Sequence, residues 1–181
     1  MLKINLSTGR RLIVDYDECP ENPRDLYGCE SRLIVLDCLY RSWGADDEMC
    51  AADLSREVKA ARRNGCKVFP VYTDGSNLST SPSFASCICL SAKQIGALIF
   101  PKGTKDARKL AAWELETLSY WANGLIFAAR IEHPNGFEAV TDDCLAGIYA
   151  DDEQGAALCA ADELDLTASE SEEIRAAVKG A

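Results

Sequence analysis

Residues 104–131 read TKDARKLAAWELETLSYWANGLIFAARI and hold the helix and the strand that decide the fold. Thr104 can cap a helix that runs to about Ala122, and Asn123-Gly124 supplies its left-handed end. Leu125–Ile131 then read as a strand. Apolar side chains recur along the helix at intervals of three or four residues, which predicts one buried stripe. That stripe consists of Leu110, Trp113, Thr117, Leu118 and Trp121.

The segments on either side of this stretch add strands joined mostly by hairpins. A turn at His133-Pro134-Asn135-Gly136 leads into a strand at 137–141, and another strand follows at 144–150. Upstream, acidic residues 46–48 open a predicted helix that ends near Arg63. Strands outnumber helices, which predicts an α+β fold with a mainly antiparallel sheet and helices packed on one face. The remaining predicted strands are 2–6, 11–16, 31–40, 67–73 and 95–100.

A chain of 181 residues suits one domain of ordinary size with an appendage. We expect a core domain over residues 1–150 and an acidic helical extension over residues 151–181. The extension should contain an alanine-rich helix from Asp151 to about Ala161. A second helix should run from about Ala168 to Lys179, opened by a capping box of Thr167 and Glu170.

The net charge of −10 is concentrated near the C-terminus. Residues 131–181 carry thirteen acidic and two basic residues, whereas residues 1–130 carry sixteen acidic and seventeen basic ones. A concentrated negative field attracts basic surfaces and repels nucleic acid, so direct nucleic-acid binding is not expected. The natural partner is a protein that itself holds nucleic acid. The alternative is a solvated acidic tail that keeps the protein in solution.

Eight carboxylates around the last predicted strand and the helices after it are the candidate partner-binding residues. Those that flank the strand would be held in place, and the more distal ones would add steering that salt screens. The eight candidates are Asp142, Asp143, Asp151, Asp152, Glu153, Asp162, Glu163 and Asp165, and we expect Glu170, Glu172 and Glu173 to add to the same steering.

The sequence offers little for catalysis. His133 is the only histidine and lies in a turn, which removes most nucleophilic schemes and histidine-rich metal sites. No phosphate-binding loop of the required spacing occurs. We therefore expect no enzyme activity, cofactor or metal. The competing hypothesis is a metal-dependent nuclease or phosphoesterase that uses Asp15 and Asp17, which share one strand face, together with Asp74.

Nine cysteines in a chain without a secretion signal predict mostly free thiols in a reducing cytosol. Cys87-Ile88-Cys89 is the one close pair, and it falls short of a zinc-binding spacing, so the alternative of a metal site needs a third and a fourth ligand from distant parts of the chain. No apolar run approaches the roughly 20 residues that a membrane helix needs. The composition predicts a soluble cytoplasmic protein with no membrane partner.

Several motifs, in order along the chain, resemble a family of small proteins from phages and mobile elements, mostly of unknown function. The first is Asp15-Tyr16-Asp17-Glu18-x-Pro20-Glu21-Asn22-Pro23-Arg24-Asp25, and the resemblance spans about residues 11–153. The second motif is Phe69-Pro70-Val71-Tyr72 followed by Ser79-Thr80-Ser81-Pro82-Ser83-Phe84, and the third is the glycine-bearing strand Ile95-Gly96-Ala97-Leu98-Ile99-Phe100. The fourth is a helix-then-strand element, Glu114-Leu115-Glu116-x-x-x-x-Trp121-x-Asn123-Gly124. The last is a closing strand, Asp143-Cys144-Leu145-Ala146-Gly147-Ile148-Tyr149. The chain departs from the family at Thr73-Asp74-Gly75, where members tend to have His, and at Cys89–Ala92.

The resemblance implies a phage counter-defence protein of the anti-CRISPR or anti-restriction kind. Within that class, we expect an inhibitor of a type II CRISPR nuclease that acts in the host cytoplasm. Such a nuclease holds its heteroduplex in a positive channel and reads a short motif with arginines, which carboxylates on a rigid scaffold can occupy. The alternative within a phage is a structural or assembly factor.

Overall fold

The computed structural model describes residues 1–37, 41, 43–82, 92–134 and 143–180. The chain forms two compact units. Unit 1 is Met1–Pro20 together with Gly124–Ala181, and unit 2 is Glu21–Asn123. Unit 2 is therefore inserted into the chain of unit 1, and the boundary expected at residue 150 falls inside unit 1. The α+β class is confirmed.

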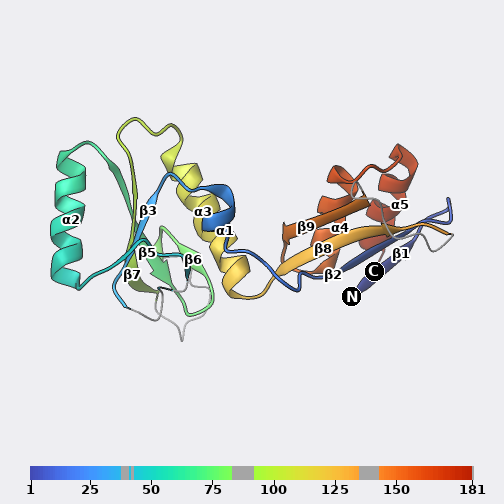
Figure 1. The fold of residues 1–181 in the computed structure, drawn as a ribbon, viewed down its shortest axis with the longest axis horizontal. Helices are drawn as coiled ribbons and strands as arrows, with labels where there is room; N and C mark the ends of the chain where they lie inside the picture. The colour runs from blue at the N-terminus through green and yellow to red at the C-terminus, as the bar shows by residue number, and fades with distance from the viewer. Residues whose placement is uncertain (38–40, 42, 83–91, 135–142, 181) are drawn as a thin grey trace. The chain divides into compact units, whose positions relative to one another are not determined.

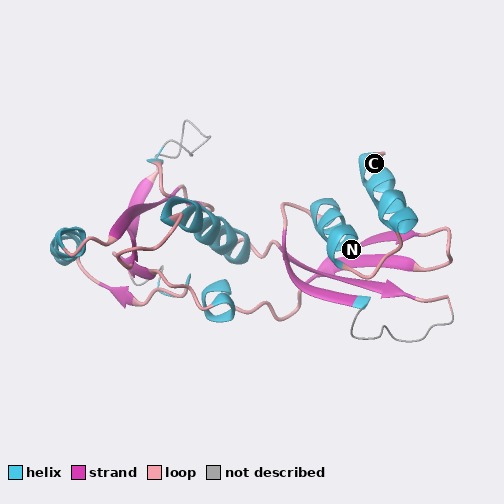
Figure 2. Ribbon diagram, turned by 90° about the horizontal axis from the view of Figure 1, so that it is seen from above, coloured by secondary structure: helices cyan, strands magenta, loops and turns pink. Residues whose placement is uncertain are grey.

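Unit 1 is built on a four-stranded antiparallel sheet in the order β1-β2-β8-β9. Its strands are β1 (Leu2–Asn5), β2 (Arg11–Tyr16), β8 (Ile126–Glu132) and β9 (Cys144–Tyr149). Alternation along the strands places one set of apolar side chains, including Leu12, Val14 and Phe127, on a common face. Helices α4 (Glu153–Glu163) and α5 (Ala168–Lys179) lie on that face (Figure 2).

The C-terminal helices are part of the core of unit 1, so the expectation of an appended extension is corrected. Four alanines of α4 are at most 4% exposed and pack against the sheet, and Ile174 of α5 is fully buried with them. Alanine allows the helix backbone to approach the strands closely, which explains how a helix with few large apolar residues can be buried. The predicted capping box of Thr167 and Glu170 opens α5 and is confirmed. The alanines are Ala156, Ala157, Ala160 and Ala161.

Unit 2 contains a five-stranded sheet in the order β4-β3-β7-β5-β6, antiparallel except for the parallel pair β3–β4 (Figure 1). Helices α2 (Ala51–Arg63) and α3 (Ala107–Ala122) pack on opposite faces of this sheet, and α1 (Pro23–Tyr27) packs on α3. Helices thus cover one face of the sheet in unit 1, as expected, and both faces in unit 2. The strands are β3 (Arg32–Val35), β4 (Asp47–Glu48), β5 (Lys67–Thr73), β6 (Leu78–Ser79) and β7 (Lys93–Phe100).

The buried face of α3 differs from the predicted stripe. Thr117 and Leu118 are buried as expected, but Leu110 is 40% exposed and Trp113 is 45% exposed. The side chains that face the sheet are smaller and include Ala107, Ala111 and Leu115. The spacing of three or four residues predicted Leu110 and Trp113 on the buried face, whereas Ala107, Ala111 and Leu115 occupy it.

Two helix starts were also predicted too early. Asp47 and Glu48, expected in the first turn of a helix, form β4 beside β3, and α2 begins only after Cys50. Asp47 accepts a hydrogen bond from Nε of Arg32 at 2.6 Å, which favours the extended pairing over a helical turn. Helix α3 begins at Ala107, because the Thr104 hydroxyl donates to the Pro101 carbonyl and caps no helix.

Gly96 lies at the centre of β7, between Val35 of β3 and Val71 of β5. A Cβ atom at this position would fall far inside van der Waals contact with the backbone carbonyl oxygen of Ile34. The glycine in the middle of this strand therefore permits a close approach between β7 and β3.

Some expectations fall outside the described residues, namely the strand at 137–141, Asp142 and the pair Cys87 and Cys89. The six cysteines that the structure describes are free thiols. Among the described residues, no helix has the combination of length and apolar character needed to cross a membrane.

Candidate functional site

The two units differ completely in charge. Unit 1 contains sixteen acidic and six basic residues, a net charge of −10, whereas unit 2 contains thirteen of each and is neutral. The whole formal charge of the chain therefore belongs to unit 1. The eight candidate carboxylates all lie in this unit, on or next to β9 and α4.

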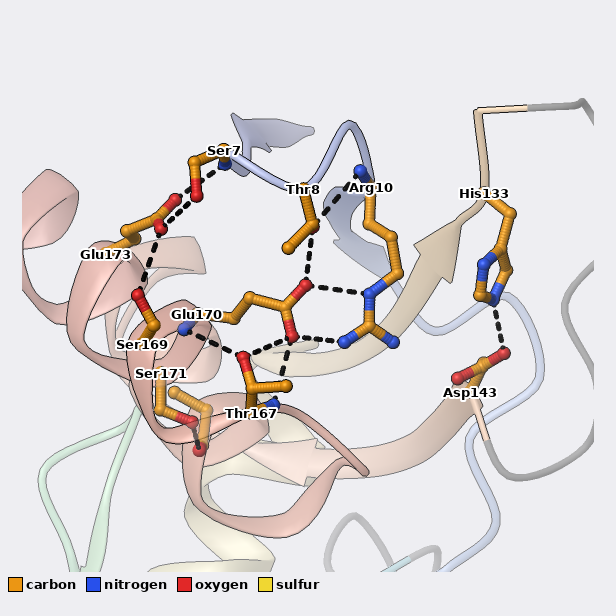
Figure 3. A network of polar contacts seen from close by, with 11 residues as sticks. Ser7, Thr8, Arg10, His133, Asp143, Thr167, Ser169, Glu170, Ser171 and Glu173 are labelled. Atoms are coloured by element: carbon orange, nitrogen blue, oxygen red, sulfur yellow. Dashed lines mark hydrogen bonds and ion pairs between the residues drawn. The ribbon is translucent and has the colours of Figure 1, made fainter.

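Two acidic residues of α5 hold the turn between β1 and β2 (Figure 3). Glu170 is fully buried and accepts hydrogen bonds from Nε of Arg10 at 2.8 Å and from the Thr8 hydroxyl at 2.6 Å. The bond from Arg10, followed by those from Thr8 and Thr167, holds the pKa of Glu170 well below its ordinary value. Glu173 accepts from the backbone N–H and the hydroxyl of Ser7. Glu170 is therefore structural and is not presented to a partner, whereas Glu173 is half-buried and bound to Ser7.

Asp143 is also committed within the unit. Its Oδ2 lies 2.8 Å from Nε2 of His133, and its side chain is only 12% exposed. His133 therefore does have a partner, although neither side chain was expected to contact the other. Burial and this contact make Asp143 a poor candidate for binding another protein.

The N-terminal end of α4 presents three of the candidates. Asp151 and Asp152 are exposed, and Asp152 also caps α4 by accepting from the N–H of Gly155 at 2.8 Å. Glu153 is half-buried, and its Oε1 lies 3.3 Å from the Met1 amino group.

The C-terminal end of α4 presents three more, Asp162, Glu163 and Asp165, all exposed. Asp162 forms an ion pair with Arg175 of α5. Burial, and then the charges of Glu163 and Asp162, raise the pKa of the Cys159 thiol, as a local negative field should. With a rise of 1.5 Å per residue, the two ends of this eleven-residue helix lie about 16 Å apart.

The carboxylates that remain exposed form what we call the acidic set. It excludes Asp143 and Glu153, it omits Asp142 because that residue lies outside the described residues, and it includes Glu172, an exposed residue of α5. The acidic set consists of Asp151, Asp152, Asp162, Glu163, Asp165 and Glu172.

Glu163 occupies an unfavourable position for the stability of its helix. It is the last residue of α4, where the partial negative charge of the helix end repels a carboxylate. The last turn of α4 contains no basic residue. Asp162 forms an ion pair with Arg175, but Glu163 forms no ion pair with any residue that the structure describes.

The alternative metal site is not assembled in the described part of the chain. Asp17 accepts hydrogen bonds from the N–H groups of Cys19 and Gly147, and Asp15 accepts from its neighbour Tyr16. Asp74 lies in unit 2 and holds a turn. No group of three or more metal-ligating side chains among the described residues is placed to hold an ion. The enzyme hypothesis stays an untested prediction.

Two of the sequence motifs meet inside unit 2. Asn22 caps α1 by accepting from the N–H of Arg24, and Pro23 is the first residue of that helix. The Arg24 side chain is 5% exposed and forms an ion pair with the equally buried Glu114 of α3. It also donates to Asp46 at 2.6 Å. The Asn-Pro-Arg segment thus fastens α1 to α3, a structural role that the local sequence did not reveal.

Comparisons with models of protein families, with curated proteins and with solved structures give no match for this chain.

Proposed function

We propose that this chain is a protein-binding inhibitor in which the acidic set of unit 1 occupies a basic, nucleic-acid-binding surface of its partner. The specific partner that we propose is a guide-loaded type II CRISPR nuclease, from which the inhibitor would exclude target DNA. The protein would then serve a phage as a counter-defence factor in the host cytoplasm.

The observation that carries the proposal is the placement of Glu163 with Asp162 and Asp165 at the C-terminal end of α4. Selection for stability alone favours Lys or Arg at such a position. A residue whose charge is unfavourable for its own helix, and which has no compensating contact, is the kind of exception expected at functional sites. If negative charge served only solubility, it could lie at the N-terminal end of a helix, where a carboxylate stabilises the helix.

Rigidity supports the same proposal. The acidic set lies in or directly beside two helices that pack on a sheet through buried alanines and Ile174, and an ion pair of Arg10 with the buried Glu170 fastens α5 to the β1–β2 turn. Carboxylates on such a scaffold lose less conformational freedom on binding than carboxylates on a flexible tail. Their spacing over about 16 Å also exceeds the roughly 12 Å width of a DNA major groove.

The choice of a CRISPR nuclease rests on the resemblance of the motifs to phage and mobile-element proteins. Proteins that hold DNA line their channels with Lys and Arg, because duplex DNA carries about one charge per 1.7 Å of axis. A type II CRISPR nuclease combines such a channel with arginines that read a short motif. Both features are complementary to the acidic set.

The direct experiment measures binding of the full chain to a purified guide-loaded type II nuclease at several salt concentrations. The test variant reverses three exposed charges of unit 1 by Asp151→Lys, Glu163→Lys and Asp165→Lys. The matched control reverses three exposed charges of unit 2 by Glu21→Lys, Glu48→Lys and Glu116→Lys. We expect salt to weaken binding, and we expect the unit 1 variant alone to weaken it by roughly tenfold or more.

Equal effects of the two triple variants, or binding indifferent to salt, would contradict the mechanism. Phage with and without the gene should also be plated on hosts with and without the CRISPR system. A counter-defence protein matters only on hosts that carry the system. A loss of plaques on both hosts would instead indicate a structural or assembly factor.

A further inference from the structure

Unit 2 contains a pocket of about 490 Å³ between α1 and α3. Every residue that lines it belongs to unit 2, so it is separate from the acidic set. Its volume falls in the range of small-molecule sites, which is about 300–1,000 Å³. Apolar side chains form most of its wall, among them Tyr27, Phe100, Leu110 and Trp113.

The floor of this pocket is fixed before any ligand arrives. Glu114 lines the pocket, yet it is only 4% exposed and its charge is balanced by the buried Arg24. The Ser31 hydroxyl donates to the same carboxylate at 2.7 Å. Gly28 is the C-cap that follows the last residue of α1, and its φ of 57° turns the chain away from the helix. A floor held by hydrogen bonds and an ion pair is typical of a preformed site, because little ordering remains to be done on binding.

The rim of the pocket exposes aromatic surface to solvent. Trp113 is 45% exposed and Tyr27 is 48% exposed, and their ring centroids lie 5.4 Å apart at an interplanar angle of 67°. Of the six large hydrophobic residues exposed in the described part of the chain, four belong to α1 and α3, namely Leu26, Tyr27, Leu110 and Trp113. Apolar groups gathered in this way mark a binding site more often than a random surface. The ring faces suit a flat aromatic compound.

Positive charge accompanies this rim. Lys105 lines the pocket, and two further exposed cations, Arg108 and Lys109, follow it in the sequence, with one exposed acid, Asp106, next to Lys105. The first turn of α3 contains no acidic residue that would neutralise them. The wall has one exposed carboxylate, Glu30, whereas Glu114 is already paired. The balance beside the aromatic rim favours an anionic group on the ligand.

We propose that this pocket binds a small organic anion that carries a flat aromatic ring, of about the size of a nucleoside monophosphate. The ring would pack against Trp113 and Tyr27, and the anionic group would lie against Lys105. This site is independent of the acidic set and of the function proposed for it.

The test titrates the full chain with four probes and follows binding by calorimetry. The probes are adenosine 5′-monophosphate, 1-naphthyl phosphate, adenosine and inorganic phosphate. We expect saturable binding of at least one of the two aromatic phosphates. Adenosine should bind roughly tenfold more weakly than its monophosphate, and inorganic phosphate should show no saturation.

Two variants assign the contacts. Lys105→Met should weaken binding of the aromatic phosphate to the level of the uncharged ring, and Trp113→Ala should abolish it. Lys59→Met, which removes an exposed cation from α2, is the matched control and should leave binding unchanged. Trp113 is half exposed, so the melting temperature of Trp113→Ala should confirm that unit 2 remains folded.

Three results would overturn the proposal. The first is that neither aromatic phosphate binds. The second is that adenosine and its monophosphate bind equally, which would show that the site does not recognise an anionic group. The third is that Lys105→Met and Lys59→Met have the same effect.

Discussion

Unit 1 and unit 2 reach stability by different means from the same chain. Unit 1 is strongly acidic, has helices on one face of its sheet and buries small alanines beneath them. Unit 2 is neutral, has a helix on each face and buries larger side chains such as Leu98, Phe100 and Leu118. In each unit a buried glutamate pairs with an arginine from a distant segment, Glu170 with Arg10 in unit 1 and Glu114 with Arg24 in unit 2.

The comparison shows where charge can be added without harming a fold. In both units a buried carboxylate is paired and hydrogen-bonded, as burial requires. Both units also have exposed carboxylates, but only in unit 1 do the acidic residues outnumber the basic ones. The three tryptophans, in contrast, all lie in unit 2, so their fluorescence reports the unfolding of unit 2, whereas circular dichroism reports both units.

The largest effect that we expect comes from Gly96→Ala. The new methyl group would collide with the backbone carbonyl of Ile34, so β7 and β3 would have to separate at the centre of the sheet. The loss should exceed about 4 kcal/mol and prevent stable folding of unit 2. Tryptophan fluorescence should be that of unfolded protein, while the helical signal of unit 1 persists. Native fluorescence in this variant would contradict the packing of β7 against β3.

A second comparison separates the buried and exposed residues of α3. Leu118→Ala should destabilise unit 2 by about 2–5 kcal/mol, because Leu118 is fully buried. Trp113→Ala should cost about 1 kcal/mol or less, because nearly half of the indole is already in water. Urea unfolding followed by fluorescence measures both. If Trp113→Ala lowered the stability of unit 2 more than Leu118→Ala, the buried face of α3 would be the aromatic stripe that the sequence predicts.

The stability of unit 1 should depend on pH through Glu170. Its folded-state pKa is lowered, so its contribution is complete above the unfolded-state pKa of about 4.3 and is lost as pH falls below that value. Glu170→Gln should therefore cost up to about 3 kcal/mol at pH 7, and the gap from the natural chain should narrow at pH 3. Urea unfolding followed by circular dichroism at the two pH values measures this gap. Glu172→Gln, at an exposed position of the same helix, should have the same free energy of unfolding as the natural chain at both pH values.

The smallest effect that we expect has the opposite sign. Glu163→Gln removes a carboxylate from the C-terminal end of α4 and should stabilise unit 1 by about 0.3–1 kcal/mol. Glu153→Gln, at the first position of the same helix, should destabilise it by a similar amount, since Glu153 also pairs with the Met1 amino group. Thermal melts at low salt should separate the two. A loss of stability in Glu163→Gln would remove the argument that this residue is kept for a partner.

Local signals in the sequence predicted much of the secondary structure. The capping box and its flanking residues located α5 at 168–179, the limits that the structure has. The β1–β2 hairpin and the fold class followed from turn residues and alternation. These features depend on contacts between residues close in sequence, which a single sequence records well.

The features that the sequence did not reveal depend on distant contacts. The insertion of unit 2 requires β2 to pair with β8, and Tyr16 lies opposite Phe127. Arg24 can be buried because it pairs with Glu114, which is distant in sequence. Asp143 is a poor partner-binding candidate because it contacts His133. The charge concentration was correctly located, but only packing distinguishes carboxylates that hold the fold, such as Glu170, from those that remain exposed.

The insertion also sets the order in which the units can form on the ribosome. When residue 123 has been added, unit 2 is complete, but unit 1 has only β1 and β2. At about 5–20 residues per second, this hairpin waits for seconds before β8 arrives. During that interval Leu12, Ile13 and Val14, all buried in the finished fold, have no sheet to join. A nascent chain stalled there would be prone to aggregate and is a natural substrate for chaperones.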